Sequence, residues 1–557
     1  MKGYILSFLL CTLSTICFSQ FHNSAEVDSV FQEWDKSDVP GCALGIVKDG
    51  SMIYSKGYGS ADLEHDIEIE PSSVFYIGSV SKQFVTFCIL LLEEDGKLDL
   101  DDKIQKYLPD FPEYDSPLTI RHFIHHTSGV RDYLTLMYLK GRNYLDHAEV
   151  EEVYDLIKRQ KELNFSPGEK YLYSNSCYFM LAMIVEKAAG ESLREFAHKN
   201  IFQPLGMNSS LFYDDNTDLI KNRVFSYEKK NDGDGFNNLI MRFDLVGSGG
   251  VYSSVDDLLL WDQNFYNNKL GKGGQDIIYK MHEEGLLNNG ESSGYAFALN
   301  NGNYKGLKTV SHGGALGGYR AQLMRFPEEN FSIIILANRG DANPTRKAYE
   351  VADILLKEKF IQESNDIATQ DDQPEDQEAI EKISIDHIPG NYEIQPGVVL
   401  EITLKNDSLQ VLQSWDESSY SIFNSKGNTF EIPDEPSVQF VFSDVENNSP
   451  QILTIFQNGN ETICKRVEPF NPSSLNMEEY TGKYDCEELD FAYTFYIEEE
   501  MLKVKIANYE PYELKAFEKD NFISEGNLFR FKRQNGAIDG FELDAGRVTN
   551  LKFEKSK

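Results

Sequence analysis

The chain has 557 residues, a length that predicts two to four domains because one hydrophobic core rarely serves so many residues. Hydrophobic residues make up 41% and charged residues 26%, the balance of a globular protein rather than of a disordered or fibrous one. The formal net charge is −37, and so acidic a surface repels phosphate backbones, which argues against nucleic acid as a partner.

The first residues have the pattern of a secretory signal peptide. Residues 1–19 begin with one lysine, continue as an apolar run and close on small residues, so we expect cleavage near Ser19. The apolar run is too short for a comfortable membrane span, and an uncleaved anchor is the less favoured alternative. We therefore expect an exported bacterial protein, periplasmic or secreted, without a stable membrane anchor.

The order of predicted elements favours an α/β domain over residues 20–360. Residues 41–60 alternate apolar and polar around Asp49-Gly50, which predicts two strands joined by a tight turn. Helical patterns fill residues 79–205, strands return at 308–337 around a turn at 327–330, and a helix closes the segment at 346–360. We expect one antiparallel sheet flanked by helices, with early and late strands pairing across an inserted helical domain.

An acidic linker is predicted at residues 361–383. Between Asp366 and Glu381 lie seven acidic residues and no Lys or Arg, which is typical of a solvated domain boundary. Proteolysis there should release an intact N-terminal domain.

Two small antiparallel β-barrels are predicted after the linker, at residues 384–470 and 471–557. The segment at Gly390-Asn391-Tyr392 recurs as Gly482-Lys483-Tyr484, each time followed by an alternating strand pattern. Because each match is short, two unrelated β modules remain the alternative.

A serine and a lysine three positions apart on a helix lie on one face, where the lysine can take the serine's proton. This spacing occurs at Ser79 and Lys82, and again at Ser226 and Lys229. The first pair opens an apolar helix, whose N-terminus favours developing negative charge, so we assign the chemistry to it. The second pair lies in a polar stretch, and we expect it at the surface.

Two further motifs could complete a site. Tyr173 and Asn175 follow a Ser-Pro-Gly-Glu turn that would present them from the helical block. His312, Gly313 and Gly314 lie on the strand before the last hairpin, where glycines would let a substrate backbone approach the sheet.

The segments FYIGSVSKQF, LTIRHFIHHTSGV, SPGEKYLYSNSCY, GSGGVYSSVDDLLLW and SHGGALGGYRAQ occur in one order along residues 25–360. In this the chain resembles the β-lactamase-related, penicillin-recognising serine hydrolases, which include class C β-lactamases, D,D-carboxypeptidases, D-aminopeptidases and esterases. Five ordered motifs are specific for the family but hardly for the substrate. The trailing barrels look like those of three-domain D-aminopeptidases, where they cover part of the cleft.

The resemblance implies a role for each motif residue. Ser79 would be the acylated nucleophile, Lys82 its proton-relay partner, Tyr173 the general base and Asn175 a substrate-contacting amide. The backbone N–H groups of Ser79 and Ala315 would form the oxyanion hole. No cofactor and no metal are expected.

His312 departs from the β-lactamase pattern, which usually has a lysine there. An imidazole with a reference pKa of about 6.5 is largely neutral at pH 7 and grips a carboxylate less firmly than an ammonium does. We therefore expect a preference for substrates without a carboxylate at this position, and acylation by penicillin that increases as the imidazole is protonated between pH 8 and 5.5.

The function that these motifs favour is a serine hydrolase acting through an acyl-enzyme on small amides, D-amino-acid peptides or esters. One alternative is a penicillin- or muropeptide-binding sensor of the same fold with little turnover. Another is an interaction protein in which the barrels bind ligands and the first domain is scaffold. The oligomeric state is left open.

Overall fold

The structure of the protein is a computed structural model. It describes residues 23–360 and 383–556, apart from residues 232, 396, 407, 415–417, 434, 458–459 and 469. The predicted signal peptide and all but the last residue of the predicted linker lie outside the described residues.

The N-terminal half is built on a six-stranded antiparallel sheet of order β10-β11-β12-β13-β1-β2. Its strands are β1 (Cys42–Lys48), β2 (Ser51–Tyr58), β10 (Asn300–Tyr304), β11 (Leu307–Leu316), β12 (Tyr319–Phe326) and β13 (Phe331–Ala337). Asp49 and Gly50 both have positive φ, as the two-residue turn between β1 and β2 requires. The pairing of β1 with β13 confirms that early and late strands share one sheet.

Helices cover both faces of this sheet and form the inserted helical domain. Val27 and Phe31, in and just after α1, share a buried cluster with Ala348 and Val351 of α11, whereas α9 contacts β1 and β13. The helices are α1 (Ser24–Val30), α2 (Lys82–Glu94), α3 (Ile120–Ile124), α4 (Tyr133–Leu139), α5 (Val150–Lys158), α6 (Asn175–Ala189), α7 (Leu193–Ala197), α8 (Gln203–Leu205), α9 (Val255–Tyr266), α10 (Asp276–Met281) and α11 (Pro344–Leu355). No helix among the described residues is long and apolar enough to cross a membrane.

Short strands complete the domain, and one of them supports the loop beside the predicted nucleophile. They are β3 (Ser60–Asp62), β4 (Ile67–Glu68), β5 (Phe75–Tyr76), β6 (Leu211–Phe212), β7 (Tyr227–Lys229), β8 (Phe236–Asn238) and β9 (Val251–Ser253). Strand β5 pairs with β9, so the segment that leads into Ser79 lies against the strand that follows the Gly-Ser-Gly-Gly loop.

Two β-rich units follow, as the sequence predicts. The first is a closed barrel of β14 (Gly390–Gln395), β15 (Val398–Lys405), β16 (Ser408–Gln413), β17 (Ser419–Lys426), β18 (Thr429–Ile432), β19 (Glu435–Glu446), β20 (Ser449–Gln457) and β21 (Asn460–Val467). The second is a nine-stranded, nearly closed sheet of β22 (Gly482–Cys486), β23 (Phe491–Glu498), β24 (Met501–Lys505), β25 (Tyr512–Glu513), β26 (Lys515–Glu518), β27 (Asn521–Ser524), β28 (Asn527–Gln534), β29 (Ala537–Ala545) and β30 (Val548–Lys555).

The repeat seen in the sequence recurs in the structure of the two barrels. Each first strand, β14 or β22, pairs with the second and with the last strand of its barrel. The repeated tyrosines make the same contact: the Tyr392 hydroxyl donates to the Ile388 carbonyl at 2.7 Å, and the Tyr484 hydroxyl to the Tyr480 carbonyl at 2.9 Å. These shared features favour related modules over two unrelated ones.

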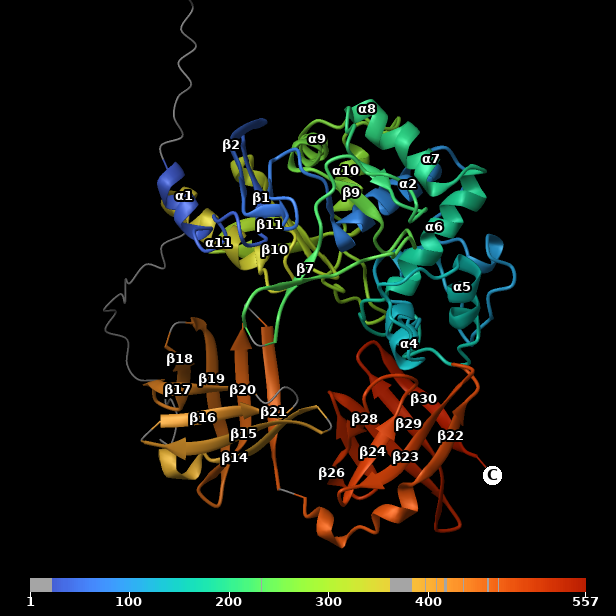
Figure 1. Cartoon of the computed structure of the whole chain (residues 1–557), viewed down its shortest axis with the longest axis vertical. Coiled ribbons are helices and arrows are strands. Elements are labelled where there is room, and N and C mark those ends of the chain that lie inside the picture. The colour runs from blue at the N-terminus through green and yellow to red at the C-terminus, as the bar shows by residue number, and fades with distance from the viewer. Residues whose placement is uncertain are drawn as a thin grey trace, which may run out of the picture.

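The second barrel is packed against the helical domain, beneath α4 and α5 in Figure 1. Its buried aromatic residues belong to the same apolar cluster as the helical domain, while the first barrel has a cluster of its own. The Tyr493 hydroxyl donates to the carbonyl of Leu139 at 2.8 Å, and the hydroxyls of Tyr138 and Tyr512 are 3.0 Å apart. The helical domain and the second barrel therefore form one packed unit.

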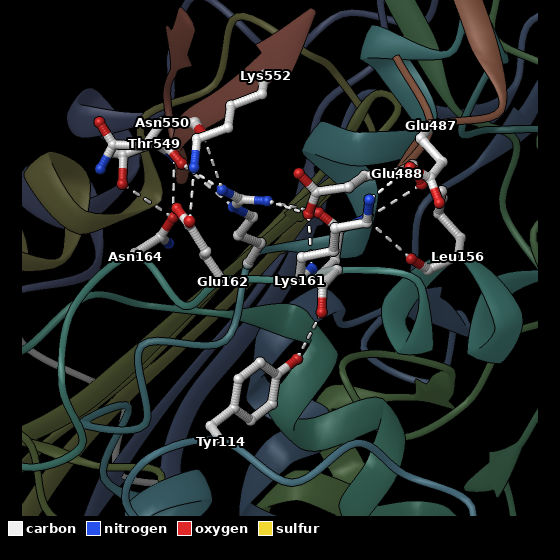
Figure 2. Close-up of polar contacts among 12 residues, drawn as sticks. Tyr114, Leu156, Lys161, Glu162, Asn164, Glu487, Glu488, Thr549, Asn550 and Lys552 are labelled. Carbon is white, nitrogen blue, oxygen red and sulfur yellow. Dashed lines mark hydrogen bonds and ion pairs between the residues drawn. The ribbon is translucent and has the colours of Figure 1, made fainter.

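A buried ion pair lies in this interface, and Figure 2 shows the polar contacts around its acidic member, Glu488. The Arg131 side chain is 0% exposed and donates to Glu488 at 2.8 Å, and Glu488 is only 6% exposed. Arg131 also donates to the carbonyls of Thr549 (2.8 Å) and Asn550 (3.1 Å) in β30. Because removing one member of such a pair leaves an uncompensated buried charge, Arg131 and Glu488 fix how the barrel sits on the domain.

Candidate active site

Ser79 and Lys82 stand where the chain enters helix α2. Ser79 lies in the one-turn helix η1 (Gly78–Ser81), and Lys82 begins α2. The Lys82 Nζ lies 3.0 Å from the Ser79 Oγ, as expected for two residues on one helical face. The structure thus brings together the pair that the sequence favoured.

Lys82 is held in a pocket of carbonyl oxygens. Its side chain is fully buried, and Nζ lies 2.9 Å from Asn175 Oδ1 and 2.5 Å from the Ser248 carbonyl. In the part of the chain that the structure describes, no carboxylate forms an ion pair with it. Burial holds the pKa of Lys82 well below its usual value, because the charged form loses its hydration and the charge of Asp132 offsets only part of that loss.

Tyr173 faces the same lysine from the segment just before α6. The Lys82 Nζ lies 4.7 Å from the centre of the Tyr173 ring. The Tyr173 hydroxyl is buried and makes no hydrogen bond of good geometry to a described residue. It nevertheless lies close enough to the Ser79 hydroxyl for the Ser79 hydroxyl to affect the pKa of Tyr173. Burial raises the pKa of Tyr173 above its usual range, and the Ser79 hydroxyl and the Arg547 guanidinium offset part of the rise.

His126 and Asp132 position the segment that contains Tyr173 and Asn175. His126 Nδ1 accepts from the Ser174 N–H at 3.1 Å, and its ring lies 4.1 Å from the Tyr173 ring. The fully buried Asp132 carboxylate accepts from the Asn175 N–H at 2.6 Å. His126 and Asp132 therefore both have a structural role, and the role of Asp132 was not predicted from the sequence.

His312 lines the site, but its ring is already engaged. Nδ1 lies 2.6 Å from the Gly313 carbonyl, and Nε2 lies 2.8 Å from the Tyr295 hydroxyl. A carbonyl can only accept, so Nδ1 carries the proton and Nε2 accepts from Tyr295. Burial lowers the pKa of His312 to about 4. The expectation of an imidazole that titrates between pH 5.5 and 8 is therefore wrong, since desolvation keeps the ring neutral there.

The glycines beside Ser79 allow η1 and β11 to approach closely. Gly78 has φ of +54°, and a Cβ on it would lie 2.5 Å from the Ala315 N. A Cβ on Gly314 would lie 2.0 Å from the Ile77 carbonyl oxygen and 3.0 Å from the Ser79 N. Gly314 is thus required by the packing of η1, whereas the sequence suggested contact with substrate. Ser79 and Ala315 both line one cavity.

The second Ser-x-x-Lys motif is not a site, but its serine is not at the surface either. Ser226 is 2% exposed, and its Oγ accepts from the Gly318 N–H at 2.7 Å. Lys229 is exposed at the end of β7, where a spacing of three places side chains on opposite faces. The expectation of a surface serine is wrong because the turn after β11 needs an acceptor for its buried N–H.

The cavity has a volume of about 590 Å³ and includes most of the predicted site. Ser79, Tyr173, Asn175, His312, Gly313, Gly314 and Ala315 all line it. Lys82 lies beneath this lining, against Ser79. One lining residue comes from the second barrel: Arg547, whose guanidinium lies 4.7 Å from the centre of the Tyr173 ring. A lone arginine in a β-turn has no sequence signature, so only the tertiary structure could assign it to the cavity.

This sheet, its helical insertion and the Ser-Lys-Tyr cluster at their junction define the β-lactamase-like class of fold. The chain belongs to the β-lactamase family, a family of hydrolases, and the family model described as Beta-lactamase matches residues 27–356.

Penicillin-binding protein 4* of Bacillus subtilis is 30% identical to the chain over 383 residues, which cover 65% of this chain and 81% of that protein. A D-aminopeptidase of Brucella anthropi is 31% identical over 322 residues, covering 57% of this chain and only 59% of its own length. The octameric penicillin-binding protein homologue from Pyrococcus abyssi has a similar fold, with a TM-score of 0.55 at 22% identity over 87% of this chain and 99% of that one.

Proposed function

We propose that the protein is a cofactor-free serine hydrolase that forms an acyl-enzyme at Ser79 and acts on small amides, D-amino-acid peptides or esters. The observation that carries the proposal is the set of three contacts made by Lys82. Two of its neighbours, Asn175 Oδ1 and the Ser248 carbonyl, can only accept hydrogen bonds. A neutral amine gives them its two N–H groups and keeps a lone pair for the Ser79 hydroxyl.

In the acylation step, Ser79 Oγ attacks the substrate carbonyl while Lys82 takes the hydroxyl proton. The lowered pKa of Lys82 and the raised pKa of Tyr173 favour the lysine as the base, in place of the tyrosine that the family resemblance suggested. The oxyanion that forms would be bound by the N–H groups of Ser79 and Ala315, and one such donor is typically worth about 3–4 kcal/mol.

Tyr173 then acts as the acid. Its buried hydroxyl, which makes no good hydrogen bond to a described residue, gives its proton to the leaving nitrogen or oxygen. The Lys82 ammonium then returns a proton to the tyrosine, by way of the Ser79 oxygen that lies beside both groups. Water attack on the ester at Ser79 reverses these transfers and releases the acid product.

One relative is named a D-aminopeptidase and another a penicillin-binding protein, so a penicillin-binding sensor is the second candidate function. A sensor would give a burst of product without steady-state turnover, whereas a hydrolase gives a sustained rate. We also propose that the protein acts outside the cytoplasm, because residues 1–19 have a signal-peptide pattern. N-terminal sequencing of the exported protein should find a start near residue 20.

The test of the mechanism is the replacement Ser79→Ala, with Ser51→Ala, an exposed serine at the start of β2, as control. We expect Ser79→Ala to lower turnover of a chromogenic ester by several orders of magnitude, because loss of a serine nucleophile can cost about 10⁶. A fluorophosphonate adduct should map to the peptide that contains Ser79. An adduct on another serine, or full activity of Ser79→Ala, would refute the assignment.

A further inference from the structure

The cavity at Ser79 is positively charged in a strongly acidic protein. The formal net charge of the chain is −37, yet the residues that line this cavity include Arg320 and Arg547 and no Asp or Glu. An adjoining cavity of about 430 Å³ against the second barrel is lined by the same two arginines. Its lining carboxylate, Asp132, is buried and bonded to the Asn175 N–H. A cationic cleft in an acidic surface attracts anions selectively.

Arg547 is held in place by its backbone. It lies in the turn between β29 and β30, and its carbonyl accepts from the Asn164 side chain at 2.9 Å and from the Asp132 N–H at 3.4 Å. Asn164 also accepts from the Thr549 N–H at 2.8 Å, and Arg131 holds the next residues of β30. The turn is therefore fixed against the domain at several points, and a group fixed in this way loses less freedom on binding.

The guanidinium of Arg547, by contrast, has donors to spare. Its side chain is 44% exposed, and its ion pair with Asp132 is long, at 3.8 Å. Asp132 is already engaged by the N–H groups of Asn175 and Thr135. The guanidinium makes no hydrogen bond to any described residue, whereas Arg320 donates to the carbonyls of Gly317 and Tyr319. Five N–H donors in a planar fork match a carboxylate.

We propose that Arg547 binds a carboxylate of the substrate, so that the second barrel supplies the specificity-determining cation of the active site. This rests on the proposed acyl-enzyme function and names its substrate class: esters or amides with a carboxylate within a few bonds of the reacting carbonyl. The second barrel thereby supplies the positive charge that a lysine in place of His312 would give. The cleft should then favour carboxylates, which reverses the expectation drawn from His312 alone. A substrate with a free ammonium group at this position would be repelled by the Arg547 guanidinium.

The test compares matched substrates in the full-length protein. In the first pair, mono-4-nitrophenyl succinate is compared with 4-nitrophenyl butyrate, and the carboxylate is in the acyl part. In the second pair, 3-carboxyphenyl acetate is compared with phenyl acetate, and the carboxylate is in the leaving group. Arg547→Gln removes the charge, Arg547→Lys keeps it without the fork, and Lys532→Gln makes the same charge change at an exposed side chain of β28. Thermal unfolding of each variant checks the fold.

We expect the wild type to prefer the charged member of at least one pair. Arg547→Gln should lower kcat/KM for that member by about tenfold or more, the size of one charge-assisted hydrogen bond, and leave its neutral partner nearly unchanged. Arg547→Lys should retain part of the preference, and Lys532→Gln all of it. Equal losses for both members of a pair, or no preference in the wild type, would overturn the proposal.

A second measurement does not depend on variants that fold. In the wild type, succinate should inhibit hydrolysis of the neutral ester more strongly than succinamide does, and added salt should weaken that inhibition. Equal inhibition by the two would also overturn the role of Arg547. Failure of the proposed function gives a different result, because no Ser79-dependent turnover of the neutral esters would then be seen.

Discussion

Glu488 offers a direct measure of how the second barrel is attached to the domain. Its Oε2 accepts from the Arg131 guanidinium at 2.8 Å and from the Lys161 N–H at 2.7 Å, in an interface where Arg131 is fully buried. Glu488→Gln keeps the shape and one acceptor oxygen but removes the negative charge. The neighbouring Glu487, whose side chain is 82% exposed and pairs with Lys161, gives a matched control.

The magnitude follows from burial. Breaking a buried ion pair by neutralising one partner costs about 3–5 kcal/mol, because the other charge stays buried without compensation. The amide oxygen that Glu488→Gln introduces still accepts from Arg131, and the carbonyls of Thr549 and Asn550 remain, so we expect a loss near the lower limit, about 3 kcal/mol. Glu487→Gln should cost no more than about 0.5–1 kcal/mol, as for other exposed pairs.

Urea unfolding of both variants, followed by tryptophan fluorescence and by turnover of a carboxylate-bearing ester, measures the difference. The loss of activity in Glu488→Gln should accompany the early transition, because an undocked barrel takes Arg547 and the β29–β30 turn away from the cavity. If Glu488→Gln unfolds at the same urea concentration as Glu487→Gln, the buried pair does not hold the barrel and the reasoning is refuted.

Two further predictions concern the linker and His312. Proteolytic cleavage within residues 361–382 should leave the second barrel bound to the N-terminal domain, because they share one apolar cluster and the Arg131–Glu488 pair; the two fragments should co-elute in gel filtration. Release of the N-terminal domain without denaturant, as the sequence suggested, would contradict this. Because the pKa of His312 is lowered to about 4, the imidazole is neutral throughout pH 5.5–8, and His312→Asn should leave the shape of the pH profile of kcat/KM unchanged in that range. An inflection that His312→Asn abolishes would show that the ring titrates there.

The sequence alone determined what depends on short spacings along the chain. The Ser79–Lys82 pair needs only one helical turn, the Asp49-Gly50 turn needs only two residues with positive φ, and the strands of both barrels follow from alternation and a repeated tyrosine. Five ordered motifs were enough to indicate the fold and seven of the residues that line the cavity. Such features are local, so neighbouring residues encode them in a pattern that can be recognised before the chain is folded.

Only the tertiary structure decided the charge and protonation of the site. Burial depends on the whole packed unit, and it is burial that lowers the pKa of Lys82, raises that of Tyr173 and keeps His312 neutral. Arg547 reaches Tyr173 from a barrel at the far end of the chain. The interface that holds this barrel in place contains the buried pair of Arg131 and Glu488, which are 357 residues apart in the sequence. The free energy of a charge depends on its surroundings in space, and spacing along the sequence does not specify those surroundings.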